Sequence, residues 1–380
     1  MHSGDRPYME ITSIDIVVPS IRHDPREMLK SMRVRIPAGT KVAWYVTSDN
    51  PSVDSAEFTH EGSPVRVIRN EKKLGAPLSR NVGLEAGTGE YVLFLDDDVE
   101  PAPDILERYA DAVRDDPDAA GYVGPTFFPD PVNSFTRGIR ASGYLFAFED
   151  APSGSPPVSW GTTSNILFSR KRIGGTRFSG VFPAAGGGED IDFCLNIAGG
   201  PVMFRTVPEA SVRHGWWGGG RRSYRRFFRW AFGDSRLTRM HPKYAYRDFP
   251  NTLEMLLFGT CAAAALALLP GISWALPAAW AGIVAACDLG TEQARTRIQR
   301  GRIMPAGGVE AAAIRLSSDL GRIAGPVSRR EAPSFLARFN YVGTSDYPRF
   351  ERKVSGARFA ASMILAAAWA AASYTLTGSP

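Results

Sequence analysis

The sequence has little cysteine and lacks an N-terminal apolar leader. Its three cysteines, Cys194, Cys261 and Cys287, are widely spaced in a chain of 380 residues. Three scattered thiols make neither a disulfide framework nor a zinc site, so we expect a reducing compartment. Residues 1–10 are polar and lack the apolar segment of a signal peptide. We therefore expect the front of the chain to stay in the cytoplasm.

A recognisable nucleic-acid module and an internal repeat are also missing. The net charge is +5, and the basic excess concentrates beyond residue 200, at 221–229 and 295–330. None of these runs is interleaved with a nucleic-acid-binding motif. The distribution favours a membrane surface or a polyanionic substrate as the partner, and no nucleic acid.

Long apolar runs are absent before residue 250, and three short ones follow. The run at 253–269 carries one charge near its start, at Glu254, whereas those at 272–287 and 359–375 carry none. Each is somewhat shorter than the roughly 20 residues that usually span a bilayer. Arginines within 291–302 are typical of a cytoplasmic return between two spans. The runs predict a two-helix hairpin plus a final span, or segments that dip into one leaflet. Buried helices of a soluble domain are the alternative.

What the first 120 residues do contain is an alternation of strands and helices. The pattern predicts strands at 14–19, 41–47, 65–68 and 91–95 and helices at 25–32, 77–86 and 103–114. Such alternation predicts an α/β fold with a doubly wound, mainly parallel sheet. Residues 121–240 are more irregular and rich in glycine and proline.

The apolar strand at 91–95 runs directly into three carboxylates, Asp96, Asp97 and Asp98. In an open α/β sheet, ligands bind at the edge where the strands end. Three adjacent negative charges are costly together unless a positive group lies among them, and a divalent cation is the usual one. The triplet therefore predicts a binding site, with a solvated acidic turn as the alternative.

The segment 71–86 leads into this strand and carries groups suited to an anion. Lys73 and Arg80 are placed to face a negative ligand, and Gly75 permits close approach of the backbone. An ordinary helix start with a surface arginine is the alternative for this segment alone.

Together these motifs closely resemble the nucleotide-binding half of family 2 glycosyltransferases of the GT-A fold. The motifs are Arg80-Asn81-x-Gly83, then Gly89-Glu90-Tyr91, then the carboxylate cluster, and the opening strand at 17–20 followed by Arg22 is also similar. The resemblance covers about residues 12–240 and implies an inverting transfer from a nucleotide-diphosphate sugar. It predicts a nucleotide-sugar-binding half at 1–120, an acceptor-binding and catalytic half at 121–240, and a helical membrane-associated region at 241–380.

The resemblance also implies roles for donor-site residues. Asp49 would recognise the base, although the family's Asp-Asp-Gly-Ser is Ser48-Asp49-Asn50-Pro51 here, so the base stays open among UDP (favoured), GDP and dTDP. Arg80 would lie near the diphosphate, and Asp96 would bind ribose. The predicted donor contacts are Pro19, Ser20, Arg22, Asp49, Lys73, Gly75, Arg80, Asn81, Asp96 and Asp97. The predicted ligands of Mg²⁺ or Mn²⁺ are Asp98, Asp96 and His214, and hard oxygen donors suit both ions.

Glu189 and Asp190 follow three glycines at the start of a predicted helix. An inverting transfer needs a carboxylate that takes the proton from the acceptor hydroxyl. The resemblance places this base at Asp190, with Glu189 as its catalytic neighbour. A helix cap is the alternative for Asp190, and Asp192 is predicted to be a solvated helix residue.

Aromatic and basic residues of the second half are predicted to contact the acceptor. Trp160 lies on a loop that enters a predicted strand. Residues 226–233 resemble the Gln-x-x-Arg-Trp motif of processive polysaccharide synthases, with Arg226 in place of the glutamine, so we predict acceptor contacts at Arg229 and Trp230. A basic amphipathic helix on lipid headgroups is the alternative.

The leading hypothesis is a metal-dependent inverting glycosyltransferase at the cell membrane, with its catalytic domain cytoplasmic and a glycan or lipid-linked acceptor. The alternatives are a polyprenyl-phosphate sugar synthase and a non-catalytic membrane scaffold with a relic sugar-nucleotide domain. A nucleotidyltransferase is disfavoured because no glycine-rich phosphate loop follows the first strand, at 18–22.

Overall fold

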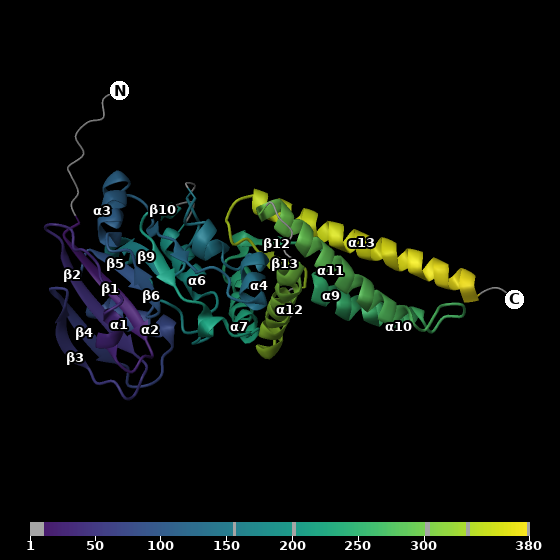
Figure 1. Cartoon of the computed structure of the whole chain (residues 1–380), viewed down its shortest axis with the longest axis horizontal. Helices are drawn as coiled ribbons and strands as arrows, with labels where there is room; N and C mark the ends of the chain where they lie inside the picture. The colour runs from purple at the N-terminus through teal and green to yellow at the C-terminus, as the bar shows by residue number, and fades with distance from the viewer. Residues whose placement is uncertain (1–10, 155–156, 200–202, 301–304, 332–334, 378–380) are drawn as a thin grey trace, which may run out of the picture. The chain divides into compact units, whose positions relative to one another are not determined.

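The chain forms two compact units (Figure 1). The computed structural model describes residues 11–154, 157–199, 203–300, 305–331 and 335–377. The first unit, called the sheet unit here, comprises residues 1–130 and 145–219. The second, the helical unit, comprises residues 131–144 and 220–380.

An eight-stranded sheet forms the centre of the sheet unit, in the order β10-β7-β9-β5-β1-β2-β4-β3. Its strands are β1 (Ser13–Ser20), β2 (Lys41–Ser48), β3 (Ala56–His60), β4 (Ser63–Arg69), β5 (Tyr91–Leu95), β7 (Tyr122–Val123), β9 (Asn165–Ser169) and β10 (Arg205–Thr206). The β1–β2, β1–β5, β2–β4 and β7–β10 pairs are parallel, whereas β3 and β9 run antiparallel to their neighbours. The predicted α/β fold with a mainly parallel sheet is confirmed.

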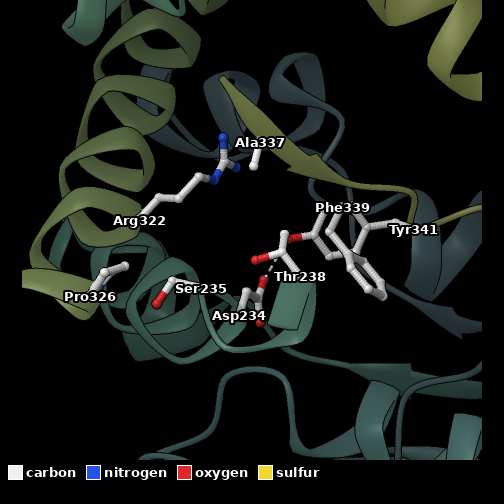
Figure 2. Close-up of a pocket in the computed structure, with 8 residues that line it drawn as sticks. All are labelled: Asp234, Ser235, Thr238, Arg322, Pro326, Ala337, Phe339 and Tyr341. Atoms are coloured by element: carbon white, nitrogen blue, oxygen red, sulfur yellow. Dashed lines mark hydrogen bonds between the residues drawn. The ribbon is translucent and has the colours of Figure 1, made fainter. Parts of the chain in front are cut away.

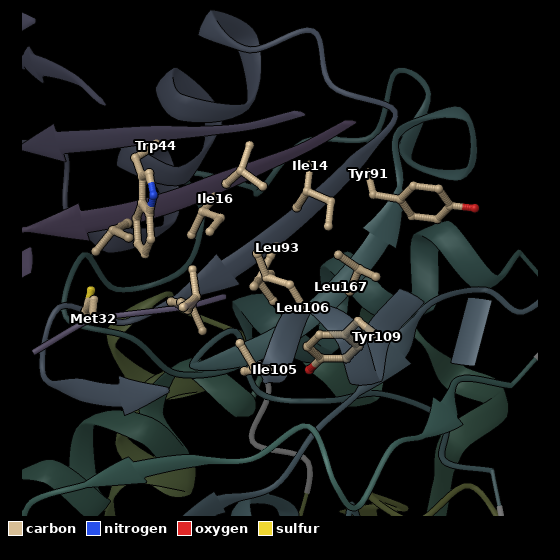
Figure 3. Packing of buried hydrophobic residues seen from close by; sticks show 14 of the residues in the cluster. Ile14, Ile16, Met32, Trp44, Tyr91, Leu93, Ile105, Leu106, Tyr109 and Leu167 are labelled. Carbon is tan, nitrogen blue, oxygen red and sulfur yellow. The ribbon is translucent and has the colours of Figure 1, made fainter. Parts of the chain in front are cut away.

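The central strands are apolar on both faces because helices cover both sides of the sheet. On β1 and β5, Ile14, Ile16 and Leu93 belong to one core cluster, while Val17 and Phe94 belong to a second cluster on the other face. Figure 3 shows the first cluster, in which Ile105, Leu106 and Tyr109 of helix α3 (Ile105–Asp115) lie beside the strands. The second cluster contains Phe168, Phe178 and Phe193, whose rings pack around Phe94. These two cores fix the strand ends that carry the candidate site.

The helices of the sheet unit follow the strands in the expected places. They are α1 (Pro25–Leu29), α2 (Ala76–Ala86), α3 (Ile105–Asp115), α5 (Arg170–Ile173) and α6 (Glu189–Ala198). A small second sheet, in the order β6-β11-β8, consists of β6 (Val99–Pro101), β8 (Thr126–Phe127) and β11 (Val212–His214). This second sheet starts immediately after the acidic triplet.

The helical unit consists mainly of long helices. Its helices are α4 (Ser134–Ser142), α7 (Arg225–Asp234), α8 (Leu237–Met240), α9 (Thr252–Glu254), α10 (Thr260–Leu266), α11 (Leu276–Arg300), α12 (Pro305–Ser328) and α13 (Asp346–Thr377), and one π-helical turn, Met255–Gly259, joins α9 to α10. Two short strands, β12 (Ala245–Arg247) and β13 (Ala337–Phe339), pair antiparallel. A small pocket beside this pair is lined by side chains at α7, α8, α12 and β13. The Tyr341 hydroxyl donates a hydrogen bond of 3.0 Å to Asp234 there (Figure 2).

One helix among the described residues is long and apolar enough to cross a membrane, at Asp346–Tyr374. It contains most of the predicted segment 359–375. The predicted segment 253–269 corresponds to a shorter apolar helix, Thr252–Leu266. The segment 272–287 corresponds to the first half of α11, which begins at Leu276.

Candidate active site

The three central parallel strands end side by side, and each carries polar residues at its end. Strand β1 ends at Ser20, β2 ends at Ser48 just before Asp49, and β5 ends at Leu95 just before Asp96. Because β1 lies between β2 and β5, these residues meet at one edge of the sheet. This is the edge where ligands bind in open α/β sheets.

Asp97 joins the ends of β1 and β5. Its carboxylate accepts hydrogen bonds from the Ser20 hydroxyl, at 2.8 Å, and from the Ile21 amide, at 3.3 Å. The Arg22 guanidinium lies 3.6 Å from the same oxygen. Burial raises the pKa of Asp97, and the Ser20 hydrogen bond opposes this rise. Asp97 therefore fixes the shape of this edge of the sheet together with Ser20 and Arg22, which are also predicted donor contacts.

Asp49 holds the segment that leads into α2. Its carboxylate accepts hydrogen bonds from the Asn70 side chain (2.8 Å) and from the amides of Leu74 (3.0 Å) and Gly75 (2.6 Å). Three N–H donors therefore already bind the carboxylate of Asp49, which is predicted to recognise the base of the nucleotide. Lys73, in the same loop, is exposed.

Gly75 has a φ of +80°, and a Cβ atom there would lie 2.4 Å from the carbonyl oxygen of Ala184. The absence of a side chain at Gly75 thus allows its backbone to lie against segment 183–188, which precedes Glu189. Gly75 brings the start of α2 against the loop that carries the candidate base.

Arg80 connects the two halves of the candidate site. It projects from α2 with a side chain that is only 4% exposed, and its Nη2 donates to Asp96 Oδ1 at 2.6 Å. Its Nη1 lies 3.9 Å from Asp190 Oδ1. Its buried Nε and Nη1 have no hydrogen-bond partner among the described residues. Burial lowers the pKa of Arg80, but Asp96, Asp190 and Glu189 outweigh burial and raise it, so the cation persists.

Asp190 is held by a residue that the sequence did not single out. The Thr163 hydroxyl donates to Asp190 Oδ1 at 2.9 Å, and the Thr163 amide donates to Oδ2 at 3.2 Å. Burial raises the pKa of Asp190, while Arg80 and Thr163 lower it. The loop before β9 and the start of α6 therefore position this carboxylate jointly.

Glu189 has different surroundings from its neighbour. It is buried, and its carboxylate accepts the amide hydrogen of Gly187 at 2.5 Å. Burial and the nearby Asp190 charge raise the pKa of Glu189. Gly186, Gly187 and Gly188 all have positive φ angles, so the loop before Glu189 has a shape that other residues rarely adopt. Glu189 closes this loop.

His214 lies next to Asp98 because β11 pairs with β6, with His214 opposite Val99. His214 Nε2 is 3.1 Å from Asp98 Oδ1, and Nδ1 hydrogen-bonds the Gly215 carbonyl. Burial lowers the pKa of His214, but the hydrogen bond to Asp98 outweighs it and raises the pKa. Phe128 stacks on the imidazole at 4.9 Å, and Trp217 meets it edge-on at 5.8 Å. The ring is therefore fixed in orientation.

The residues present fit a divalent cation as a partial ligand set. No three His, Cys, Asp or Glu side chains form a complete metal site within the described ranges. However, an Nδ1–H donated to a carbonyl leaves Nε2 as the ligand atom, which is the usual arrangement of a metal-binding histidine. Mg²⁺ sites often combine one or two carboxylates with substrate phosphate oxygens and water. Asp98 and His214 match that pattern.

The other predicted site residues are engaged elsewhere. Pro19 is buried in β1, and the Asn81 side chain exchanges two hydrogen bonds of 2.9 Å with the Phe178 backbone. Trp160 packs partly against the second core cluster. Asp192 is only 2% exposed, so the prediction of a solvated residue was wrong: α6 turns this face into the sheet unit.

Arg229 and Trp230 lie in α7 of the helical unit, described here by itself. The Trp230 ring is half-buried and packs against Phe227 at 5.8 Å and Tyr144 at 6.2 Å. The Arg226 guanidinium lies over the same ring, at 5.7 Å. The acceptor contacts predicted for Arg229 and Trp230 stay predictions.

Comparison with known proteins agrees with the motif reading. Residues 45–173 match the model of Glycosyl transferase family 2. An uncharacterized glycosyltransferase of Haemophilus influenzae is 30% identical over 145 residues, which cover 35% of this chain and 44% of that protein. The glucosyl-dolichyl phosphate glucuronosyltransferase of Haloferax volcanii is 41% identical over 61 residues, covering 16% of this chain and 19% of that protein.

The matches thus span less than half the length of either relative. The family model covers the part of the chain that contains Asp49, Arg80 and the acidic triplet. The resemblance stated from the motifs is confirmed there: residues 45–173 form a family 2 glycosyl transferase segment.

Proposed function

We propose that the chain is an inverting glycosyltransferase that moves a sugar from a nucleotide-diphosphate sugar to a hydroxyl of a glycan or lipid-linked acceptor. The reaction would take place at the cytoplasmic face of the cell membrane. The observation that carries the proposal is the position of Arg80, whose guanidinium lies between Asp96 and Asp190. Through it, the carboxylate expected at the donor and the carboxylate expected at the acceptor belong to one site.

Asp190 has the surroundings of a general base. Such a base must be ionised at the working pH and held within reach of the hydroxyl proton. Arg80 favours the ionised form of Asp190, and two hydrogen bonds from Thr163 hold the carboxylate. Its side chain is 22% exposed, so an acceptor hydroxyl has access to it. Asp190 would take that proton as the oxygen attacks the anomeric carbon.

Arg80 and the Asp98–His214 pair have the chemistry to meet the diphosphate. The unpartnered Nε and Nη1 atoms of Arg80 supply N–H donors and positive charge close to Asp96. Asp98 and His214 would hold Mg²⁺ or Mn²⁺, with Asp96, two residues before Asp98, as the third predicted ligand. When bound, the cation offsets the negative charge that develops on the leaving nucleoside diphosphate.

A lipid-linked acceptor is supported by the Haloferax relative, whose name contains glucosyl-dolichyl phosphate. An acceptor of that kind presents a sugar hydroxyl, which needs a base. A polyprenyl-phosphate sugar synthase would instead use a lipid phosphate that is already ionised and needs little base assistance. The hydrogen bonds that hold Asp190 favour the hydroxyl acceptor.

The test combines donor binding with base removal in the full-length protein. Calorimetry with UDP, GDP and dTDP, each with and without Mn²⁺, should show one preferred nucleotide whose binding requires the ion. Asp190→Asn should leave that affinity unchanged and lower turnover by roughly 10²–10⁴-fold, the range for loss of a general base. Thr59→Ala, on the far edge strand β3, serves as the matched control. Absence of binding for every nucleotide would refute the donor site and favour a scaffold, whereas unchanged turnover of Asp190→Asn would refute the base.

A further inference from the structure

The helical unit ends in an apolar bundle that contains no charged residue. Residues 255–287 and 359–380 include no Asp, Glu, Lys or Arg. Several large apolar side chains in these ranges are strongly exposed, among them Leu268 (86%), Trp274 (87%) and Ile364 (67%). Exposed apolar residues occur singly on every protein, but a contiguous patch marks a surface that something covers.

At one end of this bundle, the charged boundaries of its three helical segments lie at one level. Arg358, the last charged residue before the apolar part of α13, forms an ion pair of 3.2 Å with Asp288, where the apolar part of α11 ends. Thr252, at the start of α9, donates a hydrogen bond to the same carboxylate. These contacts align the charged ends of the three segments.

At the other end of the bundle, the same three segments also meet at one level. A Cβ atom at Gly271, in the turn between α10 and α11, would lie 3.1 Å from the Tyr374 ring. Between the two ends, Met255, Trp280 and Val284 form a buried cluster against Phe359 and Trp369 of α13. Figure 1 shows α13 running alongside α11, with α10 beside them. The hairpin and α13 therefore form one bundle.

The two ends of the bundle differ in chemistry. Beside the Asp288–Arg358 level, the exposed side chains include the cations Arg247, Arg349, Arg352 and Lys353, which suit lipid phosphates. The opposite end carries exposed Trp274 and Tyr374 (62%). Tryptophan and tyrosine concentrate where hydrocarbon meets headgroups.

The distance between these ends fits a lipid bilayer. At roughly 1.5 Å per residue, the helix from Arg358 to Tyr374 rises about 24 Å. A hydrocarbon core is about 30 Å thick, and a slightly short segment is accommodated by local thinning. We infer that the occupant of the apolar surface is a bilayer, and that α10, the first half of α11 and the second half of α13 enter it together as a three-helix bundle whose Trp274–Tyr374 end reaches the opposite interface.

This inference deepens the membrane location given in the proposed function, and it names the hairpin 255–287 as part of the inserted structure. Its test reads depth rather than activity, so its outcome is independent of sugar transfer. Two natural features help the design. Cys261 is exposed on α10, about 13 Å along the helix from Thr252, and Cys194 is buried in the sheet unit.

Full-length protein is reconstituted into phosphatidylcholine–phosphatidylglycerol vesicles and labelled at one thiol with an environment-sensitive fluorophore. One protein keeps Cys261 in a Cys287→Ala background, and the other carries Trp274→Cys with Cys261→Ala and Cys287→Ala. Lipids with a spin label at a deep or a shallow acyl position then quench the dye. We expect the deep label to quench Cys261 more strongly and the shallow label to quench position 274 more strongly. Deep quenching at position 274 would overturn the crossing, because the hairpin would then end at the bilayer centre.

A matched pair of substitutions tests the occupant. Ile364→Asp, at a 67% exposed position about 9 Å along α13 from Arg358, should sharply reduce vesicle flotation in 1 M salt, whereas Val309→Asp, at a 63% exposed position of α12, should not. Flotation of wild-type protein that 1 M salt reverses would overturn insertion and indicate a peripheral contact through the cations. A detergent-free oligomer that does not float would overturn the bilayer as occupant and identify a second copy of the chain.

Discussion

Removal of the Arg80 charge tests the electrostatics that join the two halves of the candidate site. In Arg80→Met, the carboxylates of Asp96, Asp190 and Glu189 lose the cation that lies among them. Breaking a buried ion pair by removing one partner costs about 3–5 kcal/mol. The side chains of Asp96 and Asp190 are 30% and 22% exposed, so water compensates in part. We expect a loss near the lower limit, about 3 kcal/mol.

The loss should depend on pH, with a definite sign. Burial already raises the pKa of Asp190 and of Glu189, and Arg80 opposes both shifts. Without Arg80 both values rise further. A carboxyl whose folded pKa exceeds its unfolded value loses stabilisation as the pH rises through the folded pKa. Arg80→Met should therefore be more destabilising at pH 8 than at pH 6.

Pulsed alkylation of Cys194 measures this loss of stability in the sheet unit alone, because the Cys194 thiol is completely buried in the second core cluster. Urea series at both pH values, read by mass spectrometry of the Cys194 peptide, give the midpoint of unfolding. The control is Arg177→Met, which removes an exposed 3.1 Å pair with Glu85 and should cost at most about 1 kcal/mol. Equal losses for both variants, or a larger loss at pH 6, would refute the reasoning.

Three further substitutions address other contacts. Thr163→Val removes a hydrogen bond to the charged Asp190, worth about 1.5–3 kcal/mol, and should lower kcat roughly 10–100-fold without changing KM. Thr163→Ser keeps the hydroxyl and should retain activity. Equal kcat values for the two variants would contradict the positioning role of Thr163. Gly83→Ala places a Cβ atom 2.5 Å from Val17 and should destabilise the sheet unit by about 1–3 kcal/mol in the Cys194 assay. Gly290→Ala, which has open space around it, should cause no such loss. An unchanged stability of Gly83→Ala would show that α2 can shift. His214→Ala should weaken Mn²⁺-dependent nucleotide binding at least 10-fold by calorimetry and leave metal-free binding unchanged, as expected for loss of a ligand; an equal effect in both conditions would exclude it as a ligand.

The sequence predicted the central strands because they are apolar on both faces. The runs at 14–19 and 91–95 were readable without any knowledge of partners. Strand β3 was not predicted, since its sequence, Ala-Glu-Phe-Thr-His, is largely polar, as an edge strand with one solvated face can be. The strand at β9 was expected, but its antiparallel direction depends on pairing with β5 and β7, which no local pattern records.

The candidate site divides in the same way. Asp96, Asp98, Asp190 and His214 could be singled out as candidates because each lies at the start or the end of a recognisable element. The contact of Thr163 with Asp190 could not be predicted from the sequence. It depends on the start of the antiparallel strand β9 lying beside the end of β5, where Leu95 pairs with Asn165. The stacking of Phe128 on His214 likewise depends on β8 and β11 pairing across a long stretch of chain.

The position of β1 has a consequence for any attempt to excise the family 2 segment. Strand β1 pairs with β2 on one side and β5 on the other, yet it precedes residue 45, where the matched segment begins. A fragment cloned to those limits would lose the middle strand of its sheet and expose two unpaired edges, which promote aggregation. It would also end at residue 173, before α6 and β11. Expression boundaries for the sheet unit must therefore follow hydrogen-bonded strand order rather than sequence similarity, and begin no later than Ser13.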